Sequence, residues 1–179
     1  MTTMTPVKMG VSLDALLAAK ESRAARQTDW LTHYQQPVIS LTLVTPGAVK
    51  NSQRYRNTMG VALQMCDQML WQNGWSVLDR QVLWLPTGPE AMWCVAHQAP
   101  EIKAHCAVLE QTHPLGRLWD LDVICPQAGH VGRLSLGRHL RRCLICDEPA
   151  HACSRSRKHS TEEVVACVEK MIDDWFYRD

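Results

Sequence analysis

The stretch GRLWDLDV, Gly116–Val123, places two aspartates one residue apart inside a segment that otherwise has the composition of a buried strand. Because side chains alternate between the two faces of a strand, Asp120 and Asp122 share one face, and Leu121 and Val123 share the other. Neighbouring carboxylates repel each other, whereas a divalent cation allows both to stay ionised. The pattern therefore favours a metal-binding acidic pair, and the plain alternative is a surface strand with a polar face.

The length and composition of the chain predict one domain, residues 1–179, with a sizeable apolar core: 46% of its 179 residues are hydrophobic. The net charge of +1 gives no overall attraction to nucleic acid or to an anionic membrane. Basic residues are concentrated between His130 and His159, a segment that contains seven Arg or Lys and only two acidic residues. The chain opens without the plan of a signal peptide and has no apolar stretch long enough to span a bilayer, so we expect a cytoplasmic protein.

Hydrophobic periodicity and turn residues predict an α+β fold with a mixed, mostly antiparallel sheet packed with helices. In chain order the predicted elements are a helix over 12–31, a strand over 37–47, a helix over 51–74, strands over 75–85 and 91–97, strands over 104–113 and 116–125, and a helix from residue 160. Ser160 and Glu163 form the capping-box pattern at the start of the last helix. The first helix carries no residue that predicts chemistry.

The two strands 104–113 and 116–125 are predicted to form a hairpin. If His113 pairs with Arg117, Glu110 lies opposite Asp120, and opposed residues of an antiparallel pair share a face. Three carboxylates would then converge, which suits one or two Mg²⁺ ions that bridge the phosphates of a substrate. A register slip of one residue would send Glu110 to the other face.

Two segments offer cations for phosphate groups. TPGAVKNS, 45–52, runs from a strand into a helix start, where backbone N–H groups and Lys50 can hold an anion; a routine connection with a solvated lysine is the alternative. Arg117 lies at the predicted turn, from which its long side chain can reach the aspartates.

The segment 143–159 combines a Cys-x-x-Cys pair with a third cysteine and a histidine, Cys143, Cys146, Cys153 and His159. Three thiolates and an imidazole satisfy tetrahedral Zn²⁺, and a site with four protein ligands is structural. We therefore expect a small zinc-binding loop module at this place. A set of reduced thiols, a redox pair, and His151 as the competing fourth ligand remain open. The other five cysteines lie in apolar segments and are expected in the core.

Basic residues flank the predicted zinc ligands and can neutralise phosphates through charge-assisted hydrogen bonds. They are Arg138, Arg141, Arg142, Arg155, Arg157 and Lys158. Arg141 and Arg142 are the strongest candidates, because both adjoin Cys143. A solvated charged surface is the alternative.

The blocks EQTHPLGRLWDLDV, 110–123, and RRCLIC…PAHACSRSRKH, 141–159, resemble the apo-citrate lyase phosphoribosyl-dephospho-CoA transferase family, the holo-acyl-carrier-protein synthases of citrate lyase. PGAVK, 46–50, and the order of the upstream segments are also similar, so the resemblance extends over essentially the full chain. The first 35 residues contribute little to it.

The resemblance implies a nucleotidyltransferase-like fold and a specific reaction. The donor is 2′-(5″-triphosphoribosyl)-3′-dephospho-CoA, a serine of the apo acyl-carrier subunit of citrate lyase attacks the phosphate attached to the ribose, and pyrophosphate leaves. In this interpretation Asp120 and Asp122 bind Mg²⁺, and Glu110 or one of the aspartates deprotonates the serine. The residues expected to bind substrate are Lys50, Gly116, Arg117, Arg141 and Arg142. Carriers of this kind are acidic, so the basic segment 155–158 is the expected docking face.

Two other interpretations stay open. One is the transferase that loads the same prosthetic group on malonate decarboxylase, although the Cys/His segment favours citrate lyase. The other, from a different class, is a zinc-stabilised module that binds nucleic acid or protein through its basic loop. Overall neutrality and the paired aspartates, which repel a polyanion, weigh against the second.

Overall fold

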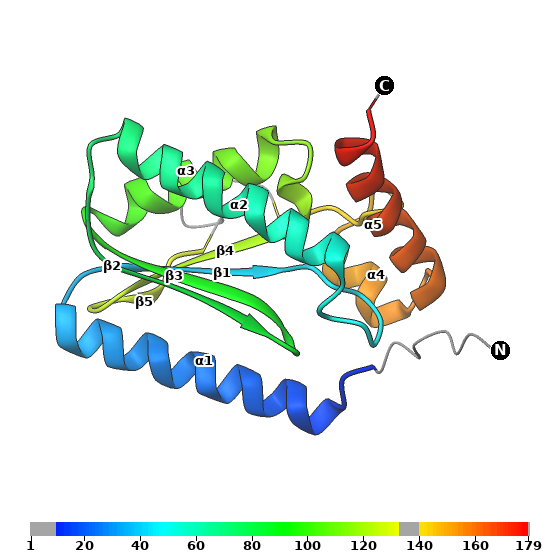
Figure 1. Cartoon of the computed structure of the whole chain (residues 1–179), viewed down its shortest axis with the longest axis horizontal. Helices are drawn as coiled ribbons and strands as arrows, with labels where there is room; N and C mark the ends of the chain where they lie inside the picture. The colour runs from blue at the N-terminus through cyan, green and yellow to red at the C-terminus, as the bar shows by residue number, and fades with distance from the viewer. Residues whose placement is uncertain (1–9, 133–139, 179) are drawn as a thin grey trace, which may run out of the picture.

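The fold is a five-stranded antiparallel sheet with helices on both faces (Figure 1). The computed structural model describes residues 10–132 and 140–178. The strand order is β2-β3-β1-β4-β5, and every strand pair in the described residues is antiparallel. The strands are β1 Val38–Leu43, β2 Ser76–Leu85, β3 Gly88–Ala96, β4 Trp119–Cys125 and β5 Gly129–His130. β1 and β4, which are far apart in sequence, are direct neighbours.

The helices divide between the faces and one end of the sheet. α1 (Leu13–Tyr34) covers one face, and α2 (Gln53–Gln72) with α3 (Ala99–Thr112) covers the other. α4 (Ala150–Ser156) and α5 (Thr161–Phe176) lie at the end of the sheet where β1 terminates (Figure 1). A short 3₁₀ helix, η1 (Gly116–Leu118), leads into β4. In the described residues, no helix is both long enough and apolar enough to cross a bilayer.

The face under α2 and α3 contains the main hydrophobic core. Alternate residues of the central strands point into it, including Ile39, Leu41, Trp93, Leu121 and Val123, all at most 1% exposed. Apolar residues of α2 and α3, among them Met59, Cys66, Ile102 and Cys106, pack against them. The core is therefore built from the alternation that the sequence of each strand predicts.

The face under α1 is mixed: Val38, Met92, Cys94 and Ile124 are buried on it beside polar side chains. α1 contains no buried residue, and side-chain hydrogen bonds attach it to the sheet. Arg23 and Arg26 both donate to Glu90 of β3, and Gln27 donates to Ser40 of β1 at 2.8 Å. Polar side chains on this side of the sheet therefore contact α1, and Asp120 projects from the same face.

Most of the predicted elements are confirmed. The first, second and last helices and the strands of β1, β2 and β3 lie where the sequence predicts them, and Ser160 and Glu163 form the capping box. Of the five cysteines expected in the core, Cys66, Cys94 and Cys106 are buried and the other two are half-buried.

The predicted hairpin of 104–113 with 116–125 is wrong. Residues 104–112 belong to α3, which begins near Pro100 and buries Ile102, Cys106 and Glu110 at helical spacing. β4 pairs instead with β1 and β5. Pro in the first turn and a four-residue apolar period favour the helix, and a short apolar run alone does not distinguish the two structures.

Candidate functional site

Asp120 and Asp122 project from the same face of β4, as strand alternation predicts. Their Cα partners on β1 are Thr42 and Ser40, respectively. Asp120 is exposed, whereas Asp122 is half-buried. The two carboxylates therefore lie next to each other at the surface under α1, which is the arrangement that a shared cation requires.

Burial raises the pKa of Asp122, and the negative charge of Asp120 raises it further. The positive charges of Lys103, His130 and Arg23 act in the opposite direction but do not outweigh these effects. The pair thus brings two like charges together, and burial adds to the cost of ionising Asp122.

Glu110 does not join the aspartates, which corrects the predicted convergence of three carboxylates. It lies on α3, is 6% exposed, and its Oε1 accepts a hydrogen bond from the backbone N–H of Leu121 at 2.8 Å. Its other oxygen lies 3.4 Å from the guanidinium of Arg141. Glu110 therefore approaches the edge of β4 from the α3 side, while the aspartates project from the other face.

Two charged side chains, buried Lys103 and half-buried Arg141, bind backbone carbonyls in the first half of β4. Arg141 donates to the carbonyl of Trp119, and Lys103 Nζ donates to the carbonyl of Leu121 at 2.7 Å. Burial lowers the pKa of Arg141, and the charges of Asp120 and Asp122 act against this. Arg141 therefore interacts electrostatically with the acidic pair, and it also supplies a hydrogen-bond donor to a backbone carbonyl of β4.

The other predicted phosphate-binding residues near β4 have distinct surroundings. Gly116 is buried, and a Cβ there would lie 2.5 Å from the Leu109 carbonyl, so glycine is required for packing against α3. Arg117 donates two hydrogen bonds, at 3.0 and 2.6 Å, to the carbonyl of Arg142. The Arg142 side chain is exposed. Arg117 and Arg141 thus tie the 141–142 segment to the start of β4.

Lys50 lies in the loop that joins β1 to α2. Its ammonium donates to the carbonyl of Thr45, and burial lowers its pKa. It lines a hollow with Lys20 and Arg23 of α1, two cations that the sequence did not predict to be functional. The sequence has no signal for them, because they are brought to Lys50 by the packing of α1.

Cys143, Cys146, Cys153 and His159 form a compact cluster, and their ligand atoms all lie within 4.8 Å of one another. The Sγ atom of Cys146 is 3.4 Å from that of Cys153 and 3.4 Å from Nε2 of His159. Part of the predicted loop module is helical, because Cys153 belongs to α4. The predicted ligand set is therefore brought together, and it could hold a metal ion such as zinc.

The thiols of this cluster differ in acidity. Burial alone would raise the pKa of Cys143, but the backbone N–H groups of Cys146 and Ile145 outweigh it and lower the pKa to about 6. Burial and the neighbouring thiols raise the pKa of Cys153 to about 12. Such a set of crowded thiols can lose all its protons when a cation compensates the charge.

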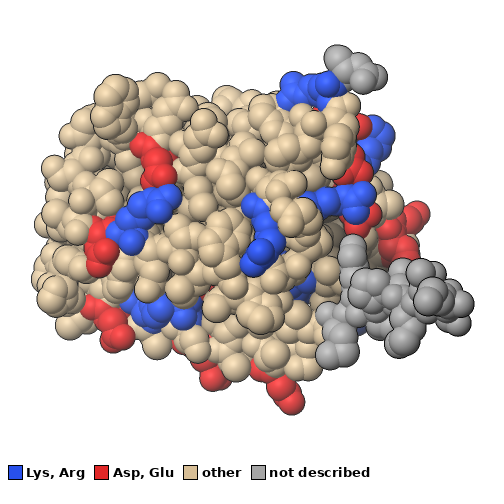
Figure 2. All heavy atoms as spheres, viewed as in Figure 1, with Lys and Arg blue, Asp and Glu red and all other residues tan. Residues whose placement is uncertain are grey.

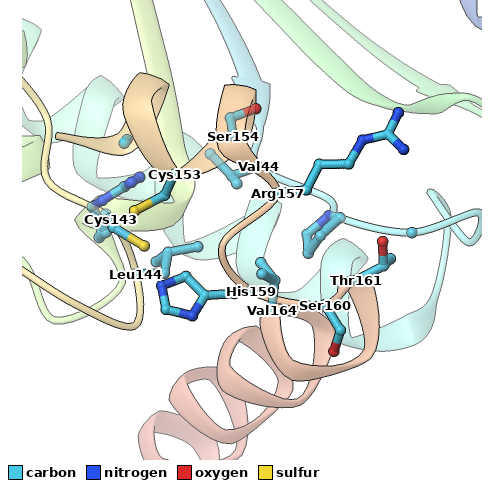
Figure 3. Close-up of a pocket in the computed structure, with 14 residues that line it drawn as sticks. Val44, Cys143, Leu144, Cys153, Ser154, Arg157, His159, Ser160, Thr161 and Val164 are labelled. Atoms are coloured by element: carbon cyan, nitrogen blue, oxygen red, sulfur yellow. The ribbon is translucent and has the colours of Figure 1, made fainter. Parts of the chain in front are cut away.

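A hollow of about 810 Å³ adjoins the cluster. Figure 3 shows that Cys143, Cys153 and His159 face one another beside Leu144, while Arg157 extends away from them. Arg117 and the loop residues Val44 and Gly47 complete other parts of the lining. The wall of this hollow is therefore formed in part by the metal-ligand set.

The remaining basic residues of the predicted set have different surroundings. Lys158 makes an ion pair with Glu148 at 3.0 Å, Arg155 is exposed, and Arg138 lies outside the described residues. On the face of the molecule seen in Figure 2, basic and acidic side chains are interspersed.

Comparisons with known proteins identify the family of this chain. The sequence profile of the family described as apo-citrate lyase phosphoribosyl-dephospho-CoA transferase (CitX) matches residues 11–175. A protein of that name from Shigella flexneri serotype 5b is 34% identical over 164 residues, which cover 92% of this chain and 90% of the relative. One from Escherichia coli O1:K1 is 33% identical with the same coverage. The chain therefore belongs to the apo-citrate lyase phosphoribosyl-dephospho-CoA transferase family.

Proposed function

We propose that this chain transfers the phosphoribosyl-dephospho-CoA group to the apo acyl-carrier subunit of citrate lyase, and that Asp120 and Asp122 are the centre of the reaction. The observation that carries the assignment is the acidic pair on one open face of β4, in a chain that matches the transferase family over residues 11–175. The fold would then be nucleotidyltransferase-like.

In the proposed reaction, the carrier serine Oγ forms a bond to the phosphorus attached to the ribose of the triphosphoribosyl donor. The bond from that phosphorus to the bridging oxygen breaks, and its electron pair leaves with pyrophosphate. The serine proton passes to a carboxylate or to water. Little covalent work is asked of the protein, because positioning and charge neutralisation supply most of the rate in phosphoryl transfer.

Mg²⁺ fits the acidic pair, because two adjacent carboxylates are hard oxygen ligands. Burial and the charge of Asp120 raise the pKa of Asp122, and a bound cation would offset both effects. When bound, the ion would neutralise phosphate charge and the charge that develops on the leaving group. Asp120 and Asp122 would hold it. Exposed Asp120 is also the better placed of the two to accept the serine proton.

Glu110 is assigned a positioning role in this proposal. Its carboxylate accepts from Leu121 N–H and faces Arg141, so its contacts hold the arginine at the start of β4. Arg141 in turn stabilises negative charge near Asp120, and Arg117, Arg142 and Lys50 supply further positive charge around the acidic face. The larger hollow, which Arg117 and Arg157 line, has room for the dephospho-CoA part of the donor.

We assign Zn²⁺ to the Cys143, Cys146, Cys153 and His159 cluster. Three thiolates and one imidazole at mutual distances within 4.8 Å match a closed tetrahedral site. The ion would hold α4 and the preceding loop against the larger hollow, so its role is structural. Metal analysis of the purified chain tests this directly: about one zinc per chain is expected, and a Cys146→Ser variant with the same zinc content would contradict the assignment.

The activity is tested by incubating the chain with apo acyl carrier, Mg²⁺ and the triphosphoribosyl donor, and then measuring the intact mass of the carrier. The carrier should gain the mass of one phosphoribosyl-dephospho-CoA group, with one pyrophosphate released per carrier. A carrier whose serine is replaced by alanine is the matched control. A carrier of unchanged mass would refute the proposed function.

A further inference from the structure

A second hollow, of about 310 Å³, lies between α1 and the sheet. It is bounded by α1, the end of β1, the loop that contains Lys50, and the turn between β2 and β3. The polar side chains in its wall include Lys20, Arg23, Thr42, Lys50 and Glu90. The turn is packed closely against this loop, since a Cβ at Gly88 would lie 3.5 Å from the Lys50 carbonyl.

The hollow has a surplus of positive charge. Glu90 is the one carboxylate in the described lining, and it accepts hydrogen bonds from both Arg23, at 2.7 Å, and Arg26. Two guanidinium groups therefore share one buried carboxylate. Within residues 10–132 and 140–178, Lys20 and Lys50 make no ion pair with an acid. An anion in the hollow would complete the charge balance.

The hollow adjoins the acidic pair. Thr42 lines it and is the Cα partner of Asp120, so the two side chains are neighbours on the same face of the sheet. The positive charge of Arg23 also reaches Asp122, because it is one of the groups that lower the pKa of that carboxyl. A polyphosphate whose reacting phosphate lies at the aspartates can thus continue into the hollow.

We propose that this hollow binds the pyrophosphate end of the triphosphoribosyl donor, with Lys20, Arg23 and Lys50 contacting its oxygens and Glu90 holding Arg23 in position. This inference rests on the proposed function. The cations neutralise the charge that the bridging oxygen gains as its bond to the reacting phosphorus breaks, and they retain the released pyrophosphate until it dissociates. It gives α1 a substrate-binding role.

The test uses inorganic pyrophosphate as the probe, in the presence of Mg²⁺ and with the full chain. Calorimetry measures the Kd of pyrophosphate for the parent protein and for Lys20→Ala, Lys50→Met and the double variant. Hydrogen bonds to charged groups are worth about 1.5–3 kcal/mol, so each single variant should weaken binding by about 10- to 150-fold. The matched control is Lys170→Ala, which removes an exposed lysine of α5. The Lys170→Ala control should bind pyrophosphate with the Kd of the parent. Every variant should bind dephospho-CoA as tightly as the parent does.

Pyrophosphate binding that is equally tight in the parent and the double variant would overturn this inference, even when the parent modifies the carrier. Equal weakening for pyrophosphate and dephospho-CoA would overturn it as well, since the lysines would then act on the whole site. Failure of the parent to modify the carrier refutes the proposed function instead. Because Lys20 is exposed, its variant is expected to fold, and circular dichroism checks this.

Discussion

The two faces of the sheet differ in composition, although they share the same strands. Under α2 and α3, the strands present Trp93, Leu121 and other apolar groups that are fully buried. Under α1, they present Ser40, Asp120 and Asp122 beside buried apolar residues such as Val38 and Ile124, and the covering helix contains no buried residue. One face is an apolar core, and the other combines apolar residues with charged groups, which the proposed function assigns to substrate binding.

β4 shows how closely the two roles are combined. Leu121 points into the core, while Asp120 and Asp122 on either side of it point to the face under α1. Stability and chemistry are therefore separated by residue parity within a single strand. Neighbouring substitutions in this strand should consequently have different effects, which gives a direct way to test the separation.

The largest expected effect is on the rate of transfer in Asp120→Asn. This change removes one of two ligands from the proposed Mg²⁺ site, and loss of electrostatic stabilisation of this kind costs about 10²–10³-fold in kcat. The measurement is carrier mass against time at saturating Mg²⁺. Because Asp120 is exposed, the thermal midpoint should stay close to that of the parent. Transfer at the parental rate would disprove a role for the acidic pair.

Leu121→Ala should act on the other face and reduce stability. A buried leucine replaced by alanine loses about 2–5 kcal/mol in the free energy of unfolding. Urea denaturation followed by tryptophan fluorescence measures the change. The matched control is Leu17→Ala, because Leu17 of α1 is 48% exposed. This variant should change the free energy of unfolding by no more than about 0.5 kcal/mol. Equal losses in the two variants would mean that α1 covers a second core.

The parts of this architecture that the sequence predicts are those with local signals. Serine caps, helical spacing and strand alternation identify α1, α5 and the shared face of Asp120 and Asp122. The Cys/His cluster is likewise compact in sequence, so its spacing predicts the three cysteines, whereas the fold decides between His151 and His159 for the fourth position.

The features that the sequence does not predict depend on tertiary contacts. Residues 104–113 are compatible with a strand or a helix, and packing on the sheet decides for α3. Arg23 meets Glu90 across 67 positions of the chain, and no periodicity encodes that contact. For the same reason, the role of Glu110 beside Arg141 and the cations around the smaller hollow emerge only from the fold.

Removal of metal from the Cys/His cluster should loosen α4 without unfolding the sheet. The helix is short, and Cys153 and His159 tie it to the preceding loop through the proposed ion. After treatment with a strong zinc chelator, hydrogen exchange should accelerate at least about 10-fold at the amides of Ala150–Ser156 and stay unchanged in β1. Identical exchange before and after chelation would show that the cluster does not depend on metal.

The smallest predicted effect is a gain in stability for Asp122→Asn, at the expense of transfer. Burial and the charge of Asp120 raise the pKa of Asp122 in the folded protein, so the folded state binds a proton more readily than the unfolded chain does. The ionised carboxyl therefore destabilises the fold above its folded-state pKa, and this cost disappears as the pH falls towards the unfolded value of about 3.9. The variant should therefore unfold at a higher temperature than the parent at pH 7, and this difference should be smaller than the change caused by Leu121→Ala. The difference in unfolding temperature should disappear near pH 4, and it should also shrink at pH 7 when Mg²⁺ neutralises the pair in the parent.

A variant that is less stable than the parent at pH 7 would mean that Asp122 stabilises the face under α1, and the division of roles between the two faces of β4 would no longer hold.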